Sequence, residues 1–423
     1  MPGILYRFGA GVLRLGTRLA AVFHPKARAR TRGAAGALDH LPATAPGRDC
    51  YWMHCASVGE FEQGRPVWER IRELHPDARF VLTFYSPSGM EFYSGRSDLG
   101  EVRYLPDDRR SAMEAFVGRL TPKLVLLVKY EWWLGLHAVL RARGIPAVVF
   151  SVAFRQNQPF FRRRHPLHSD YREALAGVAA VAVQSPASLR LLRAHDYATP
   201  ALVAGDTRLD RVLEIADDAR PDAVIEAWLA RGPGPVLVAG STWPPDEEGL
   251  GALLRARPDY RVVVAAHEVS EAATQRLRRA FAFAGVALYT EYGRRAEGAD
   301  GLPRPRVLAL DVRGVLAKAY RYAWVAYVGG GFGAGIHNVL EAAVYACPVA
   351  FGPRHGRFDE ALDLVDAGVA TPLRRPRDLV NFAARYDDEP ARSTAAAAAR
   401  AYVRERRGAT ALIIEMLAAR EWI

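Results

Sequence analysis

A cluster of glycines between residues 329 and 335 is the part of the sequence best suited to holding a phosphorylated ligand. Five of these seven positions are glycine. The preceding run Trp324–Val328 is apolar enough for a buried strand, and His337–Ala346 has the pattern of a helix. A glycine-rich turn brings the backbone close to a ligand, and the first turn of a helix favours a phosphate. The stretch predicts a nucleotide site, with a tight turn that holds no ligand as the alternative.

Two side chains behind that turn could contact the same ligand. Glu341 follows His337 by about one helical turn and would share its face, where a carboxylate can accept hydrogen bonds from ribose hydroxyls. His337 fits either a ligand contact or a core histidine whose hydrogen bonds are satisfied internally.

Polar residues also follow the apolar runs in the first half of the chain, such as Tyr51–His54 and Leu124–Lys129. Ligands of parallel α/β sheets bind outside the carboxyl ends of the strands, so the residues after these runs are candidates for chemistry. Each has a plainer explanation: Glu60 suits the start of a helix, and Lys129 could pair with Glu131. The candidates are Ser57, Glu60, Ser86, Ser88, Lys129 and Glu131.

The second half repeats this arrangement. The run Val236–Ala239 leads into Ser241 and Thr242 and then into three acids at 246–248. This is the pattern of a capped helix start, whose hydroxyls and N–H groups could also meet an anion.

The whole chain predicts an α/β protein of two domains. It has 423 residues, half of them hydrophobic and 24% charged, which is typical of a globular protein too long for one core. Strand-like and helical runs alternate along 51–204 and again along 236–351, which indicates two mainly parallel sheets with helices on both faces. We place the segments at 1–33, 34–206, 207–390 and 391–423, the last being an alanine-rich helix.

Basic charge is concentrated at the start of the chain. Lys and Arg outnumber Asp and Glu by 57 to 46, a formal charge of +11 that favours anionic partners, and no acid precedes Asp39. An apolar stripe from Ile4 to Val22 has Arg7, Arg14 and Arg18 beside it, which makes a membrane-spanning helix costly. No cleavage site for a secretory signal follows. We expect an amphipathic helix on an anionic membrane surface; the alternative is a helix that packs its stripe on the protein's own core.

The cysteines predict no special chemistry. Cys50, Cys55 and Cys347 are odd in number and form no C-x-x-C pair, which indicates reduced core thiols rather than disulfides or a zinc site.

Several motifs, taken in order, resemble the Kdo transferases, which add 3-deoxy-D-manno-octulosonic acid (Kdo) to a lipid A precursor in lipopolysaccharide assembly. The resemblance extends from the N-terminus to about residue 370 and implies a GT-B fold, two Rossmann-like lobes facing a cleft. The motifs are SVGE (57–60), KYEWW (129–133), GDTR (205–208), AGST with DEE (239–248) and GGGFGAGIHNVLEAA (329–343) with FGP (351–353).

The resemblance also implies the reaction. It would be an inverting transfer of Kdo from CMP-Kdo to a phosphorylated lipid A precursor (lipid IVA). Neither a cofactor nor a metal ion is implied, and no Asp-x-Asp lies near the motifs. The implied location is the cytoplasmic face of the bacterial inner membrane, with an anionic membrane surface as partner and no nucleic acid.

Carried over by position, the resemblance implies that Glu60 is the catalytic base and that Glu131 supports the transition state. Arg208 stands where the family commonly has a lysine. The positive charge is therefore kept, but it is carried by a planar guanidinium group instead of an ammonium group. His267 replaces an arginine of the cytidylate site, and Val315 replaces a frequent acid. The predicted nucleotide site comprises Ser241, Thr242, His267, Glu268, Arg313, Gly314, Val315, Gly330, Gly331, His337, Asn338, Val339, Leu340 and Glu341.

The residue types suit this chemistry. A glutamate can take the proton of an attacking hydroxyl if a partly apolar setting raises its pKa. The glycine turn and Arg208 could meet the phosphate leaving group. Basic residues interleaved with phenylalanines could hold the phosphates of the acceptor, although a solvated basic loop explains them as well. The acceptor candidates are Ser57, Ser86, Ser88, Lys129, Arg155, Arg162 and Arg163.

Two other functions fit parts of the pattern. One is a different GT-B enzyme that uses a UDP-sugar, such as a lipid A disaccharide synthase-like transferase or a nucleotide-sugar epimerase. The other is a non-catalytic basic protein that binds a membrane or another polyanion, for which binding would depend steeply on salt and Glu60 would have no role.

Overall fold

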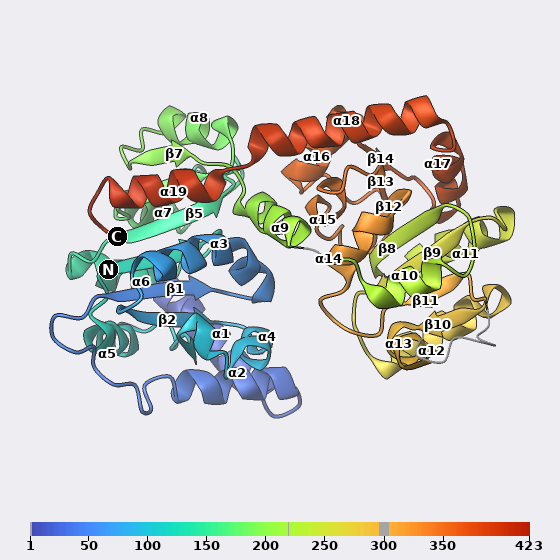
Figure 1. Cartoon of the computed structure of the whole chain (residues 1–423). Coiled ribbons are helices and arrows are strands. Elements are labelled where there is room, and N and C mark those ends of the chain that lie inside the picture. Colours follow the sequence, from blue (N-terminus) through green and yellow to red (C-terminus); the bar gives the residue numbers. More distant parts are fainter. Residues whose placement is uncertain (1, 219, 296–303) are drawn as a thin grey trace. The chain divides into compact units, whose positions relative to one another are not determined.

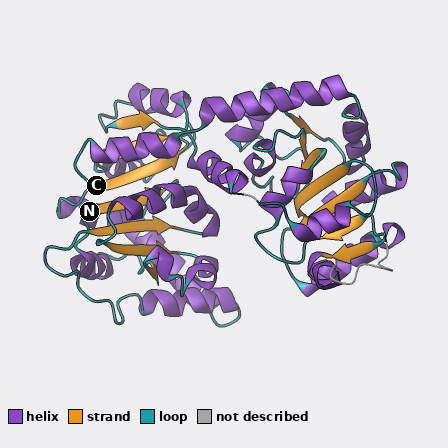
Figure 2. Ribbon diagram, viewed as in Figure 1, coloured by secondary structure: helices purple, strands orange, loops and turns teal. Residues whose placement is uncertain are grey.

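The computed structural model describes residues 2–218, 220–295 and 304–423 (Figure 1). The chain forms two compact units: residues 1–211 with 407–423, and residues 212–406. The sequence places the division between residues 206 and 207, whereas the clustering of contacts places it between 211 and 212, within α9 (Thr207–Asp217). Each unit contains a parallel sheet with helices on both faces (Figure 2).

The sheet of unit 1 has the order β3-β2-β1-β4-β5-β6-β7, and the described pairs are all parallel. The order reverses between β1 and β4, where two neighbouring strands send their helices to opposite sides. The strands are β1 (Cys50–Cys55), β2 (Arg79–Phe84), β3 (Glu101–Tyr104), β4 (Leu124–Val128), β5 (Ala147–Val152), β6 (Ala180–Val183) and β7 (Ala201–Val203). The helices between them are α3 (Val58–Leu74), α4 (Pro87–Tyr93), α5 (Arg110–Leu120), α6 (Leu134–Ala142), α7 (His168–Ala176) and α8 (Pro186–Ala194).

Burial on both faces explains why these strands are continuously apolar. In β4, Leu124, Leu126 and Val128 belong to the core on one face of the sheet. Val125 and Leu127 belong to the core on the other face. Since alternate side chains of a strand point to opposite faces, a sheet covered on both sides needs an apolar residue at every position.

The sheet of unit 2 has the order β10-β11-β9-β8-β12-β13-β14 and is also parallel in every described pair. Its strands are β8 (Val236–Thr242), β9 (Arg261–Ala266), β10 (Val286–Leu288), β11 (Val307–Ala309), β12 (Val325–Val328), β13 (Val349–Phe351) and β14 (Ala370–Pro372). The sequence analysis missed β14, a three-residue edge strand. The helices of eight or more residues are α11 (Pro244–Ala256), α12 (Glu271–Ala280), α16 (Asp359–Asp366) and α18 (Glu389–Arg406), and the shorter ones α10 (Ala223–Leu229), α13 (Tyr289–Arg295), α14 (Leu316–Ala319), α15 (Leu340–Ala343) and α17 (Leu379–Arg385).

The predicted single helix at 391–423 consists of two helices. The helix α18 ends at Arg406, and α19 (Ala409–Ala418) begins after Gly408, whose φ is +97°. Asp210 accepts hydrogen bonds from the N–H groups of Gly408 (2.7 Å) and Thr410 (2.6 Å). These bonds cap α19, which contributes to the core of unit 1 and packs on α3.

The N-terminal segment forms two helices, α1 (Ile4–Ala20) and α2 (Pro25–Ala35), both in unit 1. The apolar stripe of α1 is solvent-exposed, with Ile4 83% and Phe8 69% accessible, so the alternative in which it packs on the protein's own core is wrong. The Tyr6 hydroxyl anchors the helix by donating to Asp108 (2.7 Å) and accepting from the Leu134 N–H (3.1 Å). Among the described residues, none of the helices combines the length and apolar character needed to cross a membrane. All three cysteines are buried and free, as predicted.

Candidate functional site

Glu60 lies in the first turn of α3, directly after the carboxyl end of β1. Its Oε2 accepts hydrogen bonds from the N–H groups of Ala56 (2.6 Å) and Ser57 (3.1 Å). These donors belong to the turn that precedes the helix, where the backbone lacks helical partners. Glu60 therefore caps the start of α3, which is the plainer explanation given for it above.

The surroundings of the Glu60 carboxylate raise its pKa. Burial and the nearby charge of Glu131 raise the pKa of Glu60 to about 7, while the Ala56 N–H, His54 and Lys129 act in the opposite direction. A carboxyl group with this pKa is partly ionised near neutral pH, as a general base or acid requires.

Glu131 follows β4, the neighbour of β1, and joins a buried polar chain. Its Oε2 lies 2.8 Å from His54 Nε2 and accepts from Trp133 Nε1 at 2.6 Å. His54 Nδ1 in turn lies 3.0 Å from both the carbonyl and the hydroxyl oxygen of Thr83 on β2. Sequence analysis missed His54 and Trp133, although a histidine inside the apolar strand CYWMHC is a signal. This chain fixes the orientation of the Glu131 carboxylate.

Two cationic side chains lie at the same edge of the sheet. Lys129 ends β4 with a φ of +66°, a conformation that costs a non-glycine residue about 1 kcal/mol or more. After β7, the guanidinium group of Arg208 pairs with the carboxylate of Asp206. Arg208 Nε donates to Asp206 Oδ2 at 2.9 Å. Burial would raise the pKa of Asp206, but Arg208 lowers it below its ordinary value. Arg208 is thus held by a fixed carboxylate.

The predicted acceptor residues are divided between this edge and the surface. Ser57 precedes α3, and the Ser86 hydroxyl accepts from the Ser88 N–H at the start of α4. Arg162 and Arg163 are exposed on the loop between β5 and α7, and Arg155 is half-buried there. The phenylalanines among them (Phe154, Phe160 and Phe161) are buried in the core of unit 1.

In unit 2, a buried carboxylate holds the glycine turn. Asp246, in the first turn of α11, accepts from the N–H of Gly330 (2.9 Å), from the Tyr327 hydroxyl (2.5 Å) and from the Trp243 N–H (2.8 Å). The sequence analysis described the acids at 246–248 as part of a capped helix start, and Asp246 also binds the glycine turn. Within the described chain, the N–H groups of Gly331 and Phe332 bond to no backbone or side-chain acceptor and can receive an anion.

The helix predicted at His337–Ala346 is wrong in extent. It is reduced to α15, a single turn from Leu340 to Ala343. The Asn338 side chain caps it by accepting from the Leu340 N–H (3.2 Å) and donating to Glu341 (3.1 Å). One turn carries little dipole, so an anion here would depend on the N–H groups of the glycine turn.

Three aromatic rings stack above the carboxyl ends of β8, β9 and β12. The ring centroids of Trp243 and His267 are 4.6 Å apart, and those of His267 and His337 are 4.4 Å apart, both pairs at 24°. Burial, and then the neighbouring His267, lower the pKa of His337 to about 4; burial also lowers the pKa of His267. The stack is therefore uncharged at neutral pH. Trp243, directly after the predicted Ser241 and Thr242, was missed.

The remaining predicted nucleotide residues lie at or after the carboxyl ends of neighbouring strands. Ser241 (φ +53°) and buried Thr242 end β8, and Glu268 follows His267 after β9. Arg313 and Gly314 are exposed in the loop after β11, and Val315 precedes α14. The side chains of Val339 and Leu340 are buried. The set comes from the adjacent strands β11, β9, β8 and β12.

Comparison with known proteins adds an independent finding. Residues 25–211 match the family model described as 3-deoxy-D-manno-octulosonic-acid transferase (kdotransferase). A 3-deoxy-D-manno-octulosonic acid transferase of Bordetella pertussis is 30% identical to this chain over 92% of it and 90% of the relative. The enzyme of that name from Haemophilus influenzae is 24% identical, over 75% and 74%. The solved UDP-GlcNAc 2-epimerase from Neisseria meningitidis, bound to UDP-GlcNAc, is 10% identical with a TM-score of 0.59, over 88% of this chain and all of that one. This last likeness shows the fold alone and confirms the predicted GT-B type.

Gly331→Ala is expected to destabilise unit 2, because the added methyl would lie 2.5 Å from the backbone nitrogen of Gly352. Backbone atoms must move to relieve such a contact, at about 1–3 kcal/mol, and the melting temperature should fall by about 3 °C or more. Gly333→Ala is the matched control, since its methyl would lie 3.6 Å from the nearest atom. Equal melting temperatures for the two variants would contradict this packing.

Glu60→Gln is expected to gain stability relative to the wild type as pH rises from 5 to 8. The folded-state pKa of Glu60, about 7, lies above the value near 4.5 of an unfolded glutamate. Between these values the unfolded chain binds fewer protons, so Glu60 lowers wild-type stability as pH rises, and glutamine removes that loss. Melting temperatures of both proteins at the two pH values measure it, and a pH-independent difference would contradict the raised pKa.

Proposed function

Because the chain belongs to the family of 3-deoxy-D-manno-octulosonic acid (Kdo) transferases, which are glycosyltransferases, we propose that it transfers Kdo from CMP-Kdo to a phosphorylated lipid A precursor such as lipid IVA. The observation that carries the proposal is Glu60: a carboxylate with a pKa of about 7 beside Glu131, at the carboxyl edge of a parallel sheet. A base of this strength suits attack by a sugar hydroxyl at neutral pH.

In the proposed reaction, Glu60 takes the proton of the acceptor hydroxyl as its oxygen bonds to the anomeric carbon of Kdo. The bond between that carbon and the phosphate oxygen breaks, the electron pair leaves with CMP, and the configuration inverts. Glu131, oriented by His54 and Trp133, would stabilise positive charge that develops on the sugar ring. The two carboxylates thus have different surroundings, because Glu131 accepts from the Trp133 side chain and lies beside His54, whereas Glu60 accepts backbone N–H groups.

The donor nucleotide is proposed to bind at the carboxyl edge of the second sheet. The free N–H groups of Gly331 and Phe332 would meet the phosphate, which supports catalysis without a metal ion or cofactor. The neutral stack of Trp243, His267 and His337 offers a flat surface for the cytosine ring. Glu341 lies within reach of the same edge and would bind ribose hydroxyls.

The membrane contact is proposed for the outer face of α1. Its exposed apolar residues include Leu15 and Leu19, with accessible fractions of 59% and 62%. Such a surface is costly in water and suits the interface of a bilayer, with the basic residues of α1 and α2 close to anionic headgroups. We therefore place the enzyme at the cytoplasmic face of the bacterial inner membrane.

The function is tested by incubating the wild type with lipid IVA and a CMP-Kdo-generating system and reading the products by mass spectrometry. A product heavier by one or more Kdo residues is expected. Cytidine nucleotides should raise the melting temperature more than uridine nucleotides. A preference for uridine nucleotides would favour a UDP-sugar enzyme, and polyanion binding without any transfer would favour a non-catalytic protein.

Glu60→Gln should lower the transfer rate by about a hundredfold or more while leaving CMP affinity unchanged. For the wild type, kcat/KM should fall about tenfold per pH unit below 7, because the base becomes protonated, and the variant should lack this dependence. Glu69→Gln is the control: Glu69 lies two turns along the same helix and pairs with Arg65. Full activity in the Glu60 variant would refute the assignment of the base.

Replacing Phe8 and Leu15 together by glutamine should release the protein from vesicles that contain anionic phospholipid. Both side chains are exposed, so folding should be unaffected. A protein with Leu362→Gln and Leu412→Gln, two exposed leucines on other helices, should still sediment with the vesicles. Sedimentation of both double variants would show that α1 does not bind the membrane.

A further inference from the structure

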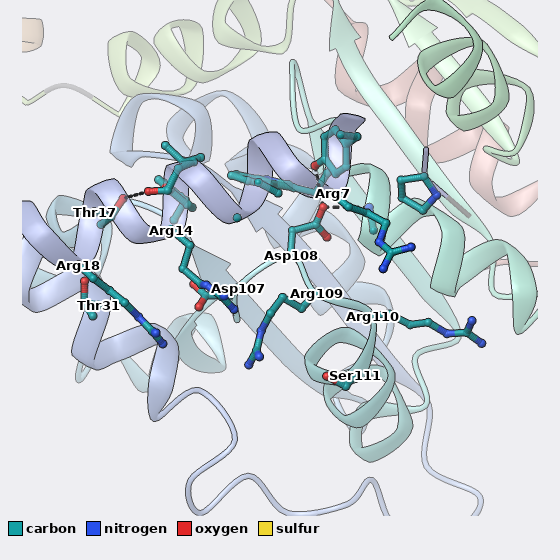
Figure 3. Close-up of a pocket in the computed structure, with 18 of the residues that line it drawn as sticks. Arg7, Arg14, Thr17, Arg18, Thr31, Asp107, Asp108, Arg109, Arg110 and Ser111 are labelled. Atoms are coloured by element: carbon teal, nitrogen blue, oxygen red, sulfur yellow. Dashed lines mark hydrogen bonds between the residues drawn. The ribbon is translucent and has the colours of Figure 1, made fainter. Parts of the chain in front are cut away.

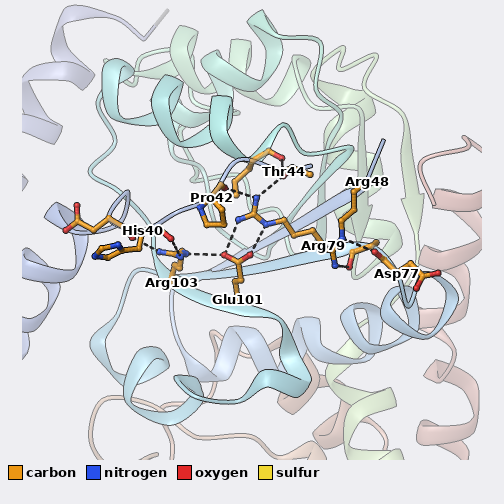
Figure 4. Close-up of polar contacts among 11 residues, drawn as sticks. His40, Pro42, Thr44, Arg48, Asp77, Arg79, Glu101 and Arg103 are labelled. Carbon is orange, nitrogen blue, oxygen red and sulfur yellow. Dashed lines mark hydrogen bonds and ion pairs between the residues drawn. The ribbon is translucent and has the colours of Figure 1, made fainter. Parts of the chain in front are cut away.

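A cavity of about 650 Å³ lies between α1, α2 and the loop that joins β3 to α5, all in unit 1. Figure 3 shows Arg14 and Arg18 extending from α1, and Arg109 from the loop, toward the same space. We call it the arginine cavity. Its cationic lining residues are Arg7, Arg14 and Arg18 of α1, Arg30 of α2, and Arg109 and Arg110 at the start of α5.

The carboxylates of the arginine cavity already have partners. Asp108 accepts from the Tyr6 hydroxyl and from two backbone N–H groups of α6. Glu114 pairs with Arg110 at 2.6 Å, and Asp107 lies 3.8 Å from Arg30. In the part of the chain that the structure describes, no carboxylate pairs with the four other arginines, at positions 7, 14, 18 and 109. A concentration of unpaired positive charge around one space favours an anionic ligand.

Arg30 provides the second, independent observation. Its side chain is 94% buried, yet Nε and Nη1 have no hydrogen-bond partner among the described residues, and neither has the hydroxyl of Thr31 beside it. A buried guanidinium with unused N–H groups is costly unless a ligand satisfies them. Arg30 and Thr31 are both lining residues of the cavity, and their three unpartnered donor atoms match in kind the several acceptor oxygens of a phosphate group.

The arginine cavity is connected to the proposed catalytic carboxylates by packed rings. The Arg30 guanidinium lies 4.3 Å from the ring centre of Tyr85, which stacks on Trp133 at 4.9 Å. Trp133 also lines the cavity, and its Nε1 donates to Glu131. A ligand in the cavity therefore lies against the same tryptophan that orients Glu131.

We propose that the arginine cavity binds a phosphate monoester of the acceptor lipid, so that Arg14, Arg18 and Arg30 select a phosphorylated acceptor. This inference rests on the proposed function, and it assigns the phosphate to a different place from Arg155, Arg162 and Arg163, which were predicted from sequence. The orientation of α1 agrees with it. Its arginine-bearing face lines the cavity, while Ile4, Phe8 and Leu15 face outward. The helix thus separates the charged and apolar parts of an amphiphilic ligand.

The test compares a deacylated, water-soluble acceptor that keeps its phosphates with the same sugar after phosphatase treatment. Calorimetry on Arg14→Gln with Arg18→Gln should show at least a tenfold lower affinity for the phosphorylated sugar, and no change for the dephosphorylated one. The matched control is Arg162→Gln with Arg163→Gln, which removes the same charge from the exposed loop. Equal losses in both double variants would show a general charge effect and overturn the proposal.

Arg30→Met separates a ligand contact from a structural role. Because methionine removes unsatisfied buried N–H groups, the melting temperature should stay the same or rise, while affinity for the phosphorylated sugar falls at least tenfold. A lower melting temperature with unchanged affinity would show that Arg30 is structural and would overturn the proposal.

Two further outcomes separate this inference from the proposed function. Arginine-dependent binding of the phosphorylated sugar by a wild type that transfers no Kdo would sustain the inference and remove the function. Kdo transfer by the Arg14/Arg18 variant with a wild-type KM for the phosphorylated acceptor would sustain the function and remove the inference. If that variant lost only its binding to anionic phospholipid vesicles, the arginines would serve membrane phosphates, and the proposal would again fail.

Discussion

Parallel strand pairing is the constraint on which both sites of this protein depend. In each sheet the described strands all run in the same direction, so the residue that follows each strand reaches one common edge. His54, Glu131 and Arg208 are distant in sequence, yet each comes at or just after the carboxyl end of a strand of the first sheet. The same rule gathers Ser241, His267 and Gly330 in unit 2. The apolar interior of each sheet thereby determines where the polar chemistry can lie.

Carboxylates with fixed hydrogen-bond partners lie at those edges. Asp246 receives three donors and fixes the glycine turn against the start of α11. The carboxylate of Asp206 accepts from the guanidinium group of Arg208 and fixes its position. Glu60 differs, because burial and the charge of Glu131 raise its pKa to about 7 against the opposing effects of the Ala56 N–H, His54 and Lys129. A carboxyl group with this raised pKa is suited to moving a proton near neutral pH.

Strained backbone marks the same places. Lys129, Ser151 and Ser241 have positive φ, each at or next to the carboxyl end of a strand. Such conformations persist in a non-glycine residue only where the surrounding packing enforces them. In unit 1 the Ser151 hydroxyl bonds to that of Thr207 at 2.7 Å, which ties the end of β5 to the segment that carries Arg208. Rigid strand ends of this kind keep the reacting groups in position without a ligand.

The N-terminal helices show how one amphipathic pattern can serve two surfaces. The sequence indicates an apolar stripe beside three arginines. It allows the stripe to contact either a membrane surface or the protein's own core. In the structure the stripe is exposed to solvent, and the arginines line a cavity whose other lining residues include Arg30 and Asp108. The choice depends on the Tyr6 hydroxyl, which bonds to Asp108 and to the N–H of Leu134, more than a hundred residues away.

The sequence alone determined the class of fold and nearly all strands, and it pointed to candidate residues at the strand ends, because these follow from local patterns. Runs such as Leu124–Val128 are apolar at every position, and a sheet covered on both faces requires that. Strand β14 was missed because three residues at an edge carry little pattern. The helix after the glycine turn was predicted too long because periodicity does not reveal that Asn338 caps a single turn. Only the tertiary structure decided the partners of Glu131 and Asp246, the stack of Trp243 with two histidines and the arginine cavity. Each of these is made by side chains far apart in the sequence, whose distances depend on how the strands and helices pack.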